Sequence, residues 1–211
     1  MQDTLLPLFP LEVVLLPSTL LPLHIFEDRY KEMIGEAIAK TSEFGVVQAG
    51  EKGILNIGCT ATVSKVVNEY PDGRMDIIGV GRRRFEILFL DEEKSYLRGT
   101  VDFFDDTDSM PAPREARVMA VACCELQRQQ EGREGEALDA DDPNLSFKVA
   151  EHVRDLGIRQ SLLAMRSEAQ RIAHLNSFFP QYLAELKRVA HVRKVGPTNG
   201  HGFIALGKQD S

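Results

Sequence analysis

The residues of this chain that could do chemistry are few and poorly grouped. Residues 202–208, GFIALGK, have the spacing of a phosphate-binding loop up to its lysine. Such a loop also needs a Ser or Thr hydroxyl for Mg²⁺ and a helix whose N-terminus faces the phosphates. Because Gln209 follows the lysine and only two residues come after it, the segment predicts no nucleotide site.

A second pattern, Gly79-Val80-Gly81, begins like a dinucleotide-binding fingerprint. Arg84 stands where the third glycine should be, and no strand-to-helix crossover follows. A strand that turns a corner explains the glycines better, since a residue without a side chain permits that bend. Neither pattern predicts a cofactor.

Histidine and cysteine also fail to assemble a site. His24 lies among Leu, Ile and Phe, where a partly buried ring that hydrogen-bonds the backbone is the common case. Cys59 and the adjacent Cys123 and Cys124 are an odd number without CxxC spacing, so we expect small buried side chains. We find no Ser, His and acid set, and we expect no metal. The other histidines lack ligand spacing: His152, His174, His191 and His201.

Charge is distributed unevenly along the 211 residues, whose net charge is −7. Residues 1–108 hold 11 basic and 19 acidic residues, which gives this part −8, and the remainder is nearly neutral. Nucleic-acid binding depends on attraction to phosphates, so the acidic half makes a nucleic-acid partner a poor expectation. The exception is Arg82-Arg83-Arg84, a basic cluster that supports RNA binding as an alternative.

Hydrophobicity sets limits on the location of the protein. Hydrophobic residues make up 43% of the chain, enough for a core. No run of 18 apolar residues occurs, and the longest candidate, 13–23, is broken by Pro17 and Pro22. The N-terminus has no basic region ahead of an apolar segment. We therefore expect no signal peptide, no membrane partner and a cytoplasmic location.

Short apolar runs rich in Val, Ile, Thr and Phe predict strands in the first half. Tyr70-Pro71-Asp72-Gly73 separates two of them and predicts a hairpin turn, because proline presets φ and glycine supplies a positive φ. So many short strands at close spacing favour a curled sheet or small barrel. The predicted strands are 44–49, 58–67, 75–80, 85–90 and 97–104.

Helices are predicted once in the first half and through most of the second. From Asp28, apolar residues recur at helical spacing as far as Ile38, and Asp28 is suited to cap this helix. Residues 114–130 are helical in composition, and an acidic loop follows at 131–142.

Later helix signals are carried by single residues. Pro143 introduces a helix that Gly157 is placed to end. Ser167 and Gln170 fit a capping box for a last helix, in which Pro180 predicts a kink or a fresh start. With the break in strand pattern near two prolines, these signals predict a strand domain at 1–110, a helical domain at 111–195 and a tail at 196–211.

The most informative segment lies near the N-terminus. Leu6-Pro7-Leu8-Phe9-Pro10-Leu11 is followed by Leu21-Pro22-Leu23-His24-Ile25-Phe26-Glu27-Asp28-Arg29-Tyr30. This opening resembles the N-terminal substrate-recognition domain of the ATP-dependent Lon protease family, with Pro17-Ser18 for the family's Pro-Gly and Asp28 for its second proline. Shorter matches extend the resemblance to about residues 4–190: 44–47, 57–61, 72–74 and 84–87.

The resemblance implies an α+β fold in which a PUA-like β pseudo-barrel is followed by a small helical bundle. Lon proteases carry an ATPase module and a Ser-Lys peptidase module after this domain, and this chain ends before either could begin. The resemblance therefore implies a stand-alone, non-catalytic module that captures apolar or unfolded polypeptide without ATP. The partners it implies are extended polypeptide and a separate ATP-dependent protease.

Candidate contacts are taken from the proline-rich segment and the end of the last predicted strand. They would capture apolar side chains on a hydrophobic face or sheet edge, while two arginines steer carboxylates. Taken singly, each apolar candidate is more commonly a residue that fills the core. RNA binding and an unrecognised hydrolase stay open as other classes of function. The predicted contacts are Leu20, Leu21, Pro22, Leu23, Phe26, Phe103 and Phe104, with Arg29 and Arg84 as the steering charges.

Overall fold

Strands dominate the first half of the fold and helices the second. The structure is a computed structural model that describes residues 5–50, 53–108 and 110–195, with the backbone alone for 189–195; the predicted tail at 196–211 lies outside the described residues. The strands are β1 (Leu6–Leu11), β2 (Leu20–Ile25), β3 (Phe44–Gly50), β4 (Gly53–Glu69), β5 (Met75–Asp91) and β6 (Arg98–Phe104). The helices are α1 (Asp28–Lys40), α2 (Arg114–Glu131), α3 (Leu145–Ala150), α4 (Leu156–Ala164) and α5 (Glu168–Val195).

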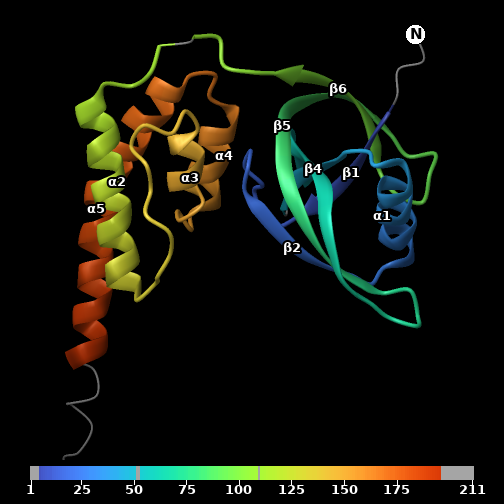
Figure 1. The fold of residues 1–211 in the computed structure, drawn as a ribbon, viewed down its shortest axis with the longest axis horizontal. Coiled ribbons are helices and arrows are strands. Elements are labelled where there is room, and N and C mark those ends of the chain that lie inside the picture. The colour runs from blue at the N-terminus through green and yellow to red at the C-terminus, as the bar shows by residue number, and fades with distance from the viewer. Residues whose placement is uncertain (1–4, 51–52, 109, 196–211) are drawn as a thin grey trace, which may run out of the picture.

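Five strands close into a ring, and β2 lies outside it (Figure 1). The strand order is β2-β5-β4-β3-β1-β6, and β6 also pairs with β5, which completes the ring. β1 and β3 run parallel, while the other described pairs are antiparallel. The predicted α+β fold, a mixed-sheet pseudo-barrel followed by helices, is confirmed.

β1 tolerates two prolines because the N–H groups that they lack would point to positions where no described strand offers an acceptor. The Leu8 N–H donates to the Leu97 carbonyl on the β6 side. Backbone groups alternate along a strand, so Pro10 faces the same side as Leu8, beyond the residues that pair with β6. Pro7 faces β3 but precedes Leu8, where that pairing begins. The proline-rich opening therefore fits a strand inside the ring.

β5 is one long strand, whereas the sequence predicts two. A Cβ atom on Gly81 would lie 2.1 Å from the Leu16 carbonyl oxygen, so another segment approaches too closely for any other residue. Pairing with β4 shifts register nearby, between Cys59 and Ala61. The glycine interrupts the apolar pattern, but the backbone keeps pairing through it, so the predicted break is wrong.

α1 begins at Asp28, as predicted. The preceding Glu27 takes the N-cap position without a side-chain bond to the helix, so the predicted capping role of Asp28 is wrong. The helix buries Tyr30, Met33, Ile34 and Ala37 against the sheet.

The predicted hairpin turn between β4 and β5 is confirmed, since Gly73 has a φ of 80° and its N–H donates to the Tyr70 carbonyl at 2.9 Å.

The predicted helix end at Gly157 is wrong. α3 already ends at Ala150, and Gly157 lies in the first turn of α4. Asp155 caps α4, because its side chain accepts the Ile158 N–H at 3.0 Å. A glycine two residues after an Asp that caps lies at the start of a helix here and not at its end.

α5 keeps its predicted start, and it does not begin afresh at Pro180. Ser167 accepts the Gln170 N–H at 3.2 Å, as expected of a cap. The helix then runs through Pro180 as far as Val195, without a fresh start.

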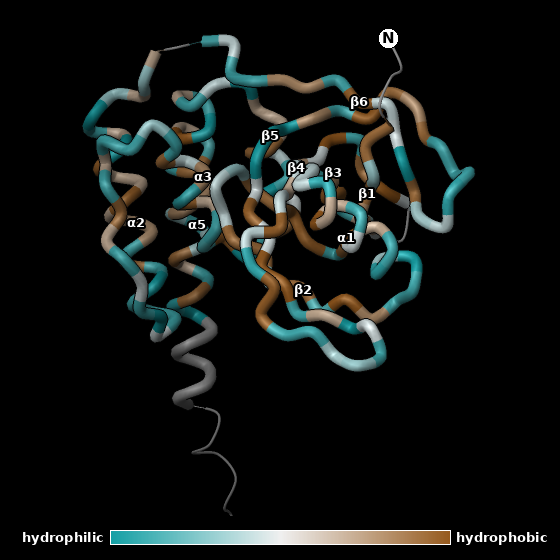
Figure 2. Tube along the Cα trace, turned by 45° about the vertical axis from the view of Figure 1, so that its right-hand side comes forward, coloured by the Kyte–Doolittle hydropathy of each residue, from teal (hydrophilic) through white to brown (hydrophobic). Residues whose placement is uncertain are grey.

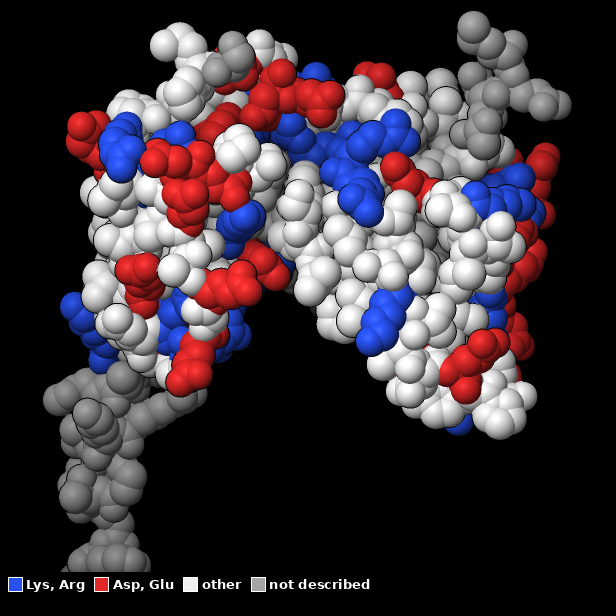
Figure 3. All heavy atoms as spheres, viewed as in Figure 1, with Lys and Arg blue, Asp and Glu red and all other residues white. Residues whose placement is uncertain are grey.

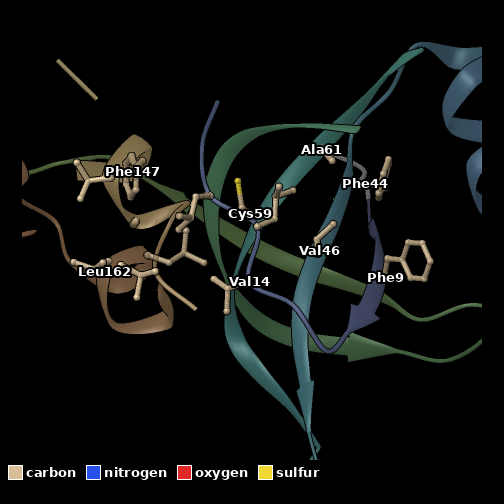
Figure 4. Close-up of a cluster of buried hydrophobic side chains, with 14 of the residues drawn as sticks. Phe9, Val14, Phe44, Val46, Cys59, Ala61, Phe147 and Leu162 are labelled. Carbon is tan, nitrogen blue, oxygen red and sulfur yellow. The ribbon is translucent and has the colours of Figure 1, made fainter. Parts of the chain in front are cut away.

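One hydrophobic core joins the barrel to the bundle. Hydrophobic stretches (brown in Figure 2) follow the strands and helices, and most loops are teal. In Figure 4, Val14 and Cys59 of the barrel lie toward Phe147 and Leu162 of the helices. All four belong to one cluster of buried residues.

A buried ion network also joins the two parts, at Asp106 between β6 and α2. Arg84 of β5 donates to Asp106 Oδ1 at 2.7 Å, and Arg171 of α5 donates to Oδ1 and Oδ2 at 2.7 and 2.6 Å. Both arginines are buried, and both guanidinium groups lie over the Phe147 ring. The domain boundary predicted at residue 110 falls in this same connecting segment.

Candidate peptide-binding surface

β2 exposes one row of side chains and buries much of the other. Leu20, Pro22 and His24 are exposed, with 61% of Leu20 accessible, whereas Ile25 is buried. Side chains alternate along a strand, so the exposed residues share one face. Phe26 continues the row just beyond the strand and is 59% exposed.

β5 widens this row. In the antiparallel pair, Leu20 lies opposite Val80 and Pro22 lies opposite Ile78. Residues directly opposite each other share a face of the sheet, and both β5 side chains are half-buried. We call the surface of Leu20, Pro22, Phe26, Ile78 and Val80 the β2 face. It gathers five apolar side chains that could cover apolar groups of a ligand.

A hydrogen-bond network around Asp76 borders the β2 face. His24 Nδ1 lies 2.6 Å from Asp76 Oδ1, while Tyr70 Oη and Asn68 Nδ2 donate to Oδ2 at 2.8 and 2.9 Å. These bonds, that from Asn68 foremost, lower the pKa of Asp76 to about 2, and the bond to Asp76 raises the pKa of Tyr70. The His24 ring thus bonds a carboxylate, where the sequence predicts a backbone partner, and the Phe26 ring stacks on it.

The free edge of β2 is poor in hydrogen-bond donors. The Gly81 N–H donates to the Thr19 carbonyl at 2.9 Å, which fixes the alternation of backbone groups along the strand. Leu20, Pro22 and His24 therefore point their backbone groups away from β5. Proline has no N–H, so only two of these three positions offer a donor to an added strand.

β2 borders a cleft between the barrel and the helices. Figure 1 shows β2 on the side of the barrel nearest the helices. Figure 3, in the same view, shows the surface hollowed between the two parts, with a mostly uncharged wall on the barrel side. An apolar strand face and a neighbouring cleft are thus placed together.

Comparison with known proteins decides the family. The model of the family described as the "ATP-dependent protease La (LON) substrate-binding domain" matches residues 5–179. The chain belongs to the Lon substrate-binding domain family. This confirms the resemblance seen in the N-terminal segment.

Relatives with known names agree with this Lon assignment. A Lon protease of Parabacteroides distasonis is 34% identical over an alignment of 122 residues. The match covers 54% of this chain and 15% of that protein, so the chain spans a small part of this relative's length. The fold is shared with the Lon N-terminal domain protein from Xanthomonas campestris, with a TM-score of 0.68 and 24% identity over 84% of this chain and 99% of that one. It is also shared with the N-terminal domain of the Mycobacterium avium complex Lon protease, with a TM-score of 0.62 and 16% identity over 84% and 98% of the two chains.

The predicted contacts of this Lon domain do not all reach one surface. Leu21 and Leu23 are half-buried on the opposite face of β2 and pack against the core. Phe104 and Arg84 are buried, with 6% and 5% of their surface exposed. Neither residue is available to a ligand on the β2 face, and Arg84 is held by Asp106.

Phe103 and Arg29 are exposed but engaged elsewhere. Phe103 lines a pocket of about 750 Å³ between α1 and β6, to which β2 contributes no residue. The Arg83 guanidinium lies over the Phe103 ring, 3.8 Å from its centre. Arg29 pairs with Glu27 at 2.7 Å and lies over the Tyr30 ring. The structure thus brings Leu20, Pro22 and Phe26 together and separates the other predicted contacts from them.

The arginine triplet is divided among three environments. Arg82 is exposed and donates to Thr62, Arg83 pairs with Glu43 at 3.0 Å, and Arg84 is buried. Only two of the three reach the surface, and one of those already has a carboxylate partner.

Two of the three cysteines are buried, as predicted, and the third is half-buried. Cys59 and Cys124 are buried, and burial raises the pKa of each thiol to about 12. Cys123 is half-buried, and all three cysteines are free of disulfides.

Within residues 5–50, 53–108 and 110–195, no group of acidic, His and Cys side chains is arranged to hold a metal ion. No described helix is long and apolar enough to span a membrane.

Sequence reasoning misses the part of the surface that β5 provides. Ile78 and Val80 alternate with the buried Ile77 and with Gly79, a period-2 signal that could have marked them as outward-facing. Their position beside β2 depends on strand register and has no local signal.

Proposed function

We propose that this chain binds extended, apolar polypeptide segments on the β2 face. The observation that carries the proposal is the exposure of Leu20 on β2 and of Phe26 just beyond it, which are 61% and 59% accessible beside a cleft. Exposed apolar side chains grouped on one surface mark sites where another molecule covers them. An extended segment places every second side chain on one side, which matches the spacing of a strand face.

Family membership supports the same function. The family is described as a substrate-binding domain, and the Parabacteroides relative is a Lon protease. We propose that this chain works as a non-catalytic receptor for unfolded protein, with a separate ATP-dependent protease as the recipient of its clients. Binding itself needs no ATP, because it rests on apolar contact alone.

Side-chain contact, and not strand addition, is the proposed mode of binding. Pro22 removes an N–H from the middle of the free edge of β2, and edge prolines are a known device against pairing with another chain. The lack of this N–H does not limit contact through the apolar side chains beside Pro22. Specificity would then depend on the apolar character of the client more than on its backbone hydrogen bonds.

The test is a titration of fluorescently labelled, unfolded casein followed by anisotropy. Burial of a Leu or Phe side chain is worth about 1.5–3 kcal/mol, so the double variant Leu20→Ser and Phe26→Ser should weaken binding by about tenfold or more. A matched control is Leu88→Ser with Phe89→Ser, which removes a similarly exposed leucine and phenylalanine, 53% and 74% accessible, from the other end of β5.

We expect saturable binding without ATP, lost in the first double variant and kept in the second. Equal losses in both variants would mean that surface hydrophobicity in general, and not the β2 face, binds the client. Absence of saturable binding by the unchanged chain would overturn the proposed function.

A further inference from the structure

α2 carries an apolar stripe on the face that it turns to solvent. Val118, Met119 and Leu126 are 48%, 49% and 47% exposed, and Ala122 is exposed between them. At 3.6 residues per turn these four positions fall on one side of the helix. The opposite side is buried and includes Ala120, Cys124, Gln127 and Arg128. α2 therefore buries one side in the bundle and presents a second, apolar side to solvent.

The stripe faces away from the rest of the chain. Figure 1 shows α2 on the side of the bundle remote from the barrel, and the turned view of Figure 2 again places it at the outer edge. Its buried side packs on α5 and α3. Among the described residues, none covers the stripe.

We propose that a second copy of this chain docks on the stripe, with the two α2 helices antiparallel and crossing at Ala122. Two-fold symmetry then sets Ala122 against its own copy, where the small side chain permits close approach. Met119 of each copy lies beside Leu126 of the other, so apolar groups cover each other. A stripe that is central, apolar and self-complementary is the surface that an isologous contact requires.

Charge at the ends of the stripe selects the antiparallel arrangement. Glu115 and Gln129 are exposed and flank the stripe seven residues on either side of Ala122. The antiparallel pair sets Glu115 of one copy near Gln129 of the other. A parallel pair would set Glu115 beside Glu115 and Glu125 beside Glu125, which like-charge repulsion disfavours.

The size of the stripe predicts a weak dimer. From Glu115 to Gln129 the helix rises about 21 Å, and a contact of one such helix with another is small beside the roughly 1,200 Å² that stable interfaces bury. Dimerisation should therefore depend on concentration. Because the stripe and the β2 face lie on different parts of the molecule, the dimer leaves both β2 faces free, and the inference does not rest on the proposed function.

The test is sedimentation of the whole chain over a range of concentrations. Met119→Lys and Leu126→Glu should each weaken dimerisation by about tenfold or more, as loss of a central apolar contact does. The two changes together should restore it to within about threefold, because each new lysine lies beside the new glutamate of the other copy. The two positions are seven residues apart in one helix, too far to rescue each other within a copy.

Crosslinking tests the register independently. In a Cys123→Ser background, Ala122→Cys should give a disulfide-linked dimer on mild oxidation, because position 122 meets its own copy. Gln129→Cys is the matched control on the same stripe, since its two copies would lie about 21 Å apart, beyond disulfide reach.

A monomer at every concentration would overturn the proposal, as would a dimer that neither single variant weakens. Failure of the double variant to restore the dimer, or crosslinking through position 129 in place of 122, would exclude the antiparallel contact centred on Ala122.

Discussion

Asp106 is the residue on which the junction of barrel and bundle depends. Two buried arginines from different parts of the fold donate to its carboxylate, Arg84 from β5 and Arg171 from α5. Arg171 also pairs with Glu168 at 2.9 Å, whereas Arg84 has Asp106 as its ion-pair partner among the described residues. Loss of the Asp106 charge would leave Arg84 buried without a counter-charge.

Asp106→Asn should lower the free energy of unfolding by about 3 kcal/mol, because a buried charge that loses its partner keeps the cost of leaving water. Urea unfolding followed by circular dichroism measures the change. Asp108→Asn is the control, since that exposed aspartate lies on the same connecting segment and has no described ion-pair partner. Similar small losses in both variants would mean that the network contributes little.

The unchanged chain and the Asp106→Asn variant should also differ in how their stability depends on pH. Burial alone would raise the pKa of Asp106, but the hydrogen bonds and charges of Arg171 and Arg84 outweigh it and lower the pKa. The contribution of the carboxylate is then complete above its unfolded pKa of about 3.9 and is lost as the pH falls through the lower folded value. The stability gap between the unchanged chain and Asp106→Asn should therefore be constant near neutral pH and narrow below about pH 4.

At the residue scale, the sequence predicts which residue types form the candidate surface better than it predicts whether a given side chain is buried. The exposed row of Leu20, Pro22 and Phe26 lies within the predicted segment, and the alternation that exposes it is local. Arg84 is indistinguishable in sequence from its two arginine neighbours, yet it alone is buried, because a carboxylate more than twenty residues away meets it only in the fold.

At the element scale, an apolar pattern predicts a strand or helix more reliably than a residue that interrupts the pattern predicts where that element ends. The two predicted strands 75–80 and 85–90 are one strand, since strand pairing uses backbone groups that glycine and arginine also possess. α1 and α2 were predictable nearly to the residue, α1 because its apolar residues recur at helical spacing and α2 because its helical composition begins directly after Pro113. Gly157 does not end a helix, and no new helix begins at Pro180, because the surrounding helices override the local preference of each residue.

Pro180 provides a test of that override. A proline inside a helix lacks the N–H that would bond the carbonyl four residues earlier, and its ring crowds that carbonyl. The residue is exposed in the middle of α5, so no packing would be lost with it. Pro180→Ala should raise the free energy of unfolding by about 1–3 kcal/mol in urea titrations.

Gln181→Ala is the matched control for this change, because it alters the next exposed position of the same helix and should move stability by less than about 0.5 kcal/mol. A loss of stability in Pro180→Ala would show that the proline is needed for the local backbone of α5.

At the scale of the whole molecule, the N-terminal motif predicted the fold because it belongs to a family whose shape is known. The local patterns predict a strand-rich half, as a curled sheet or small barrel, and a helical half. They do not predict that β5 and β6 close the ring or that β2 lies outside it, since both depend on pairing between distant segments. The candidate surface could not be predicted in full for the same reason, because β2 and β5 lie side by side only in the folded sheet.

The shared core predicts that the two parts unfold together. Leu162 of α4 is fully buried in the cluster that also holds Val14 and Cys59 of the barrel (Figure 4). Leu162→Ala should cost about 2–5 kcal/mol, and amide hydrogen exchange should show the same loss of protection in β3 as in α5. Leu90→Ala, at an exposed leucine of β5, is the control and should change neither. Loss of protection in the helices with unchanged protection in β3 would mean that barrel and bundle are separate folding units, and that the buried contacts between them contribute little to the stability of the barrel.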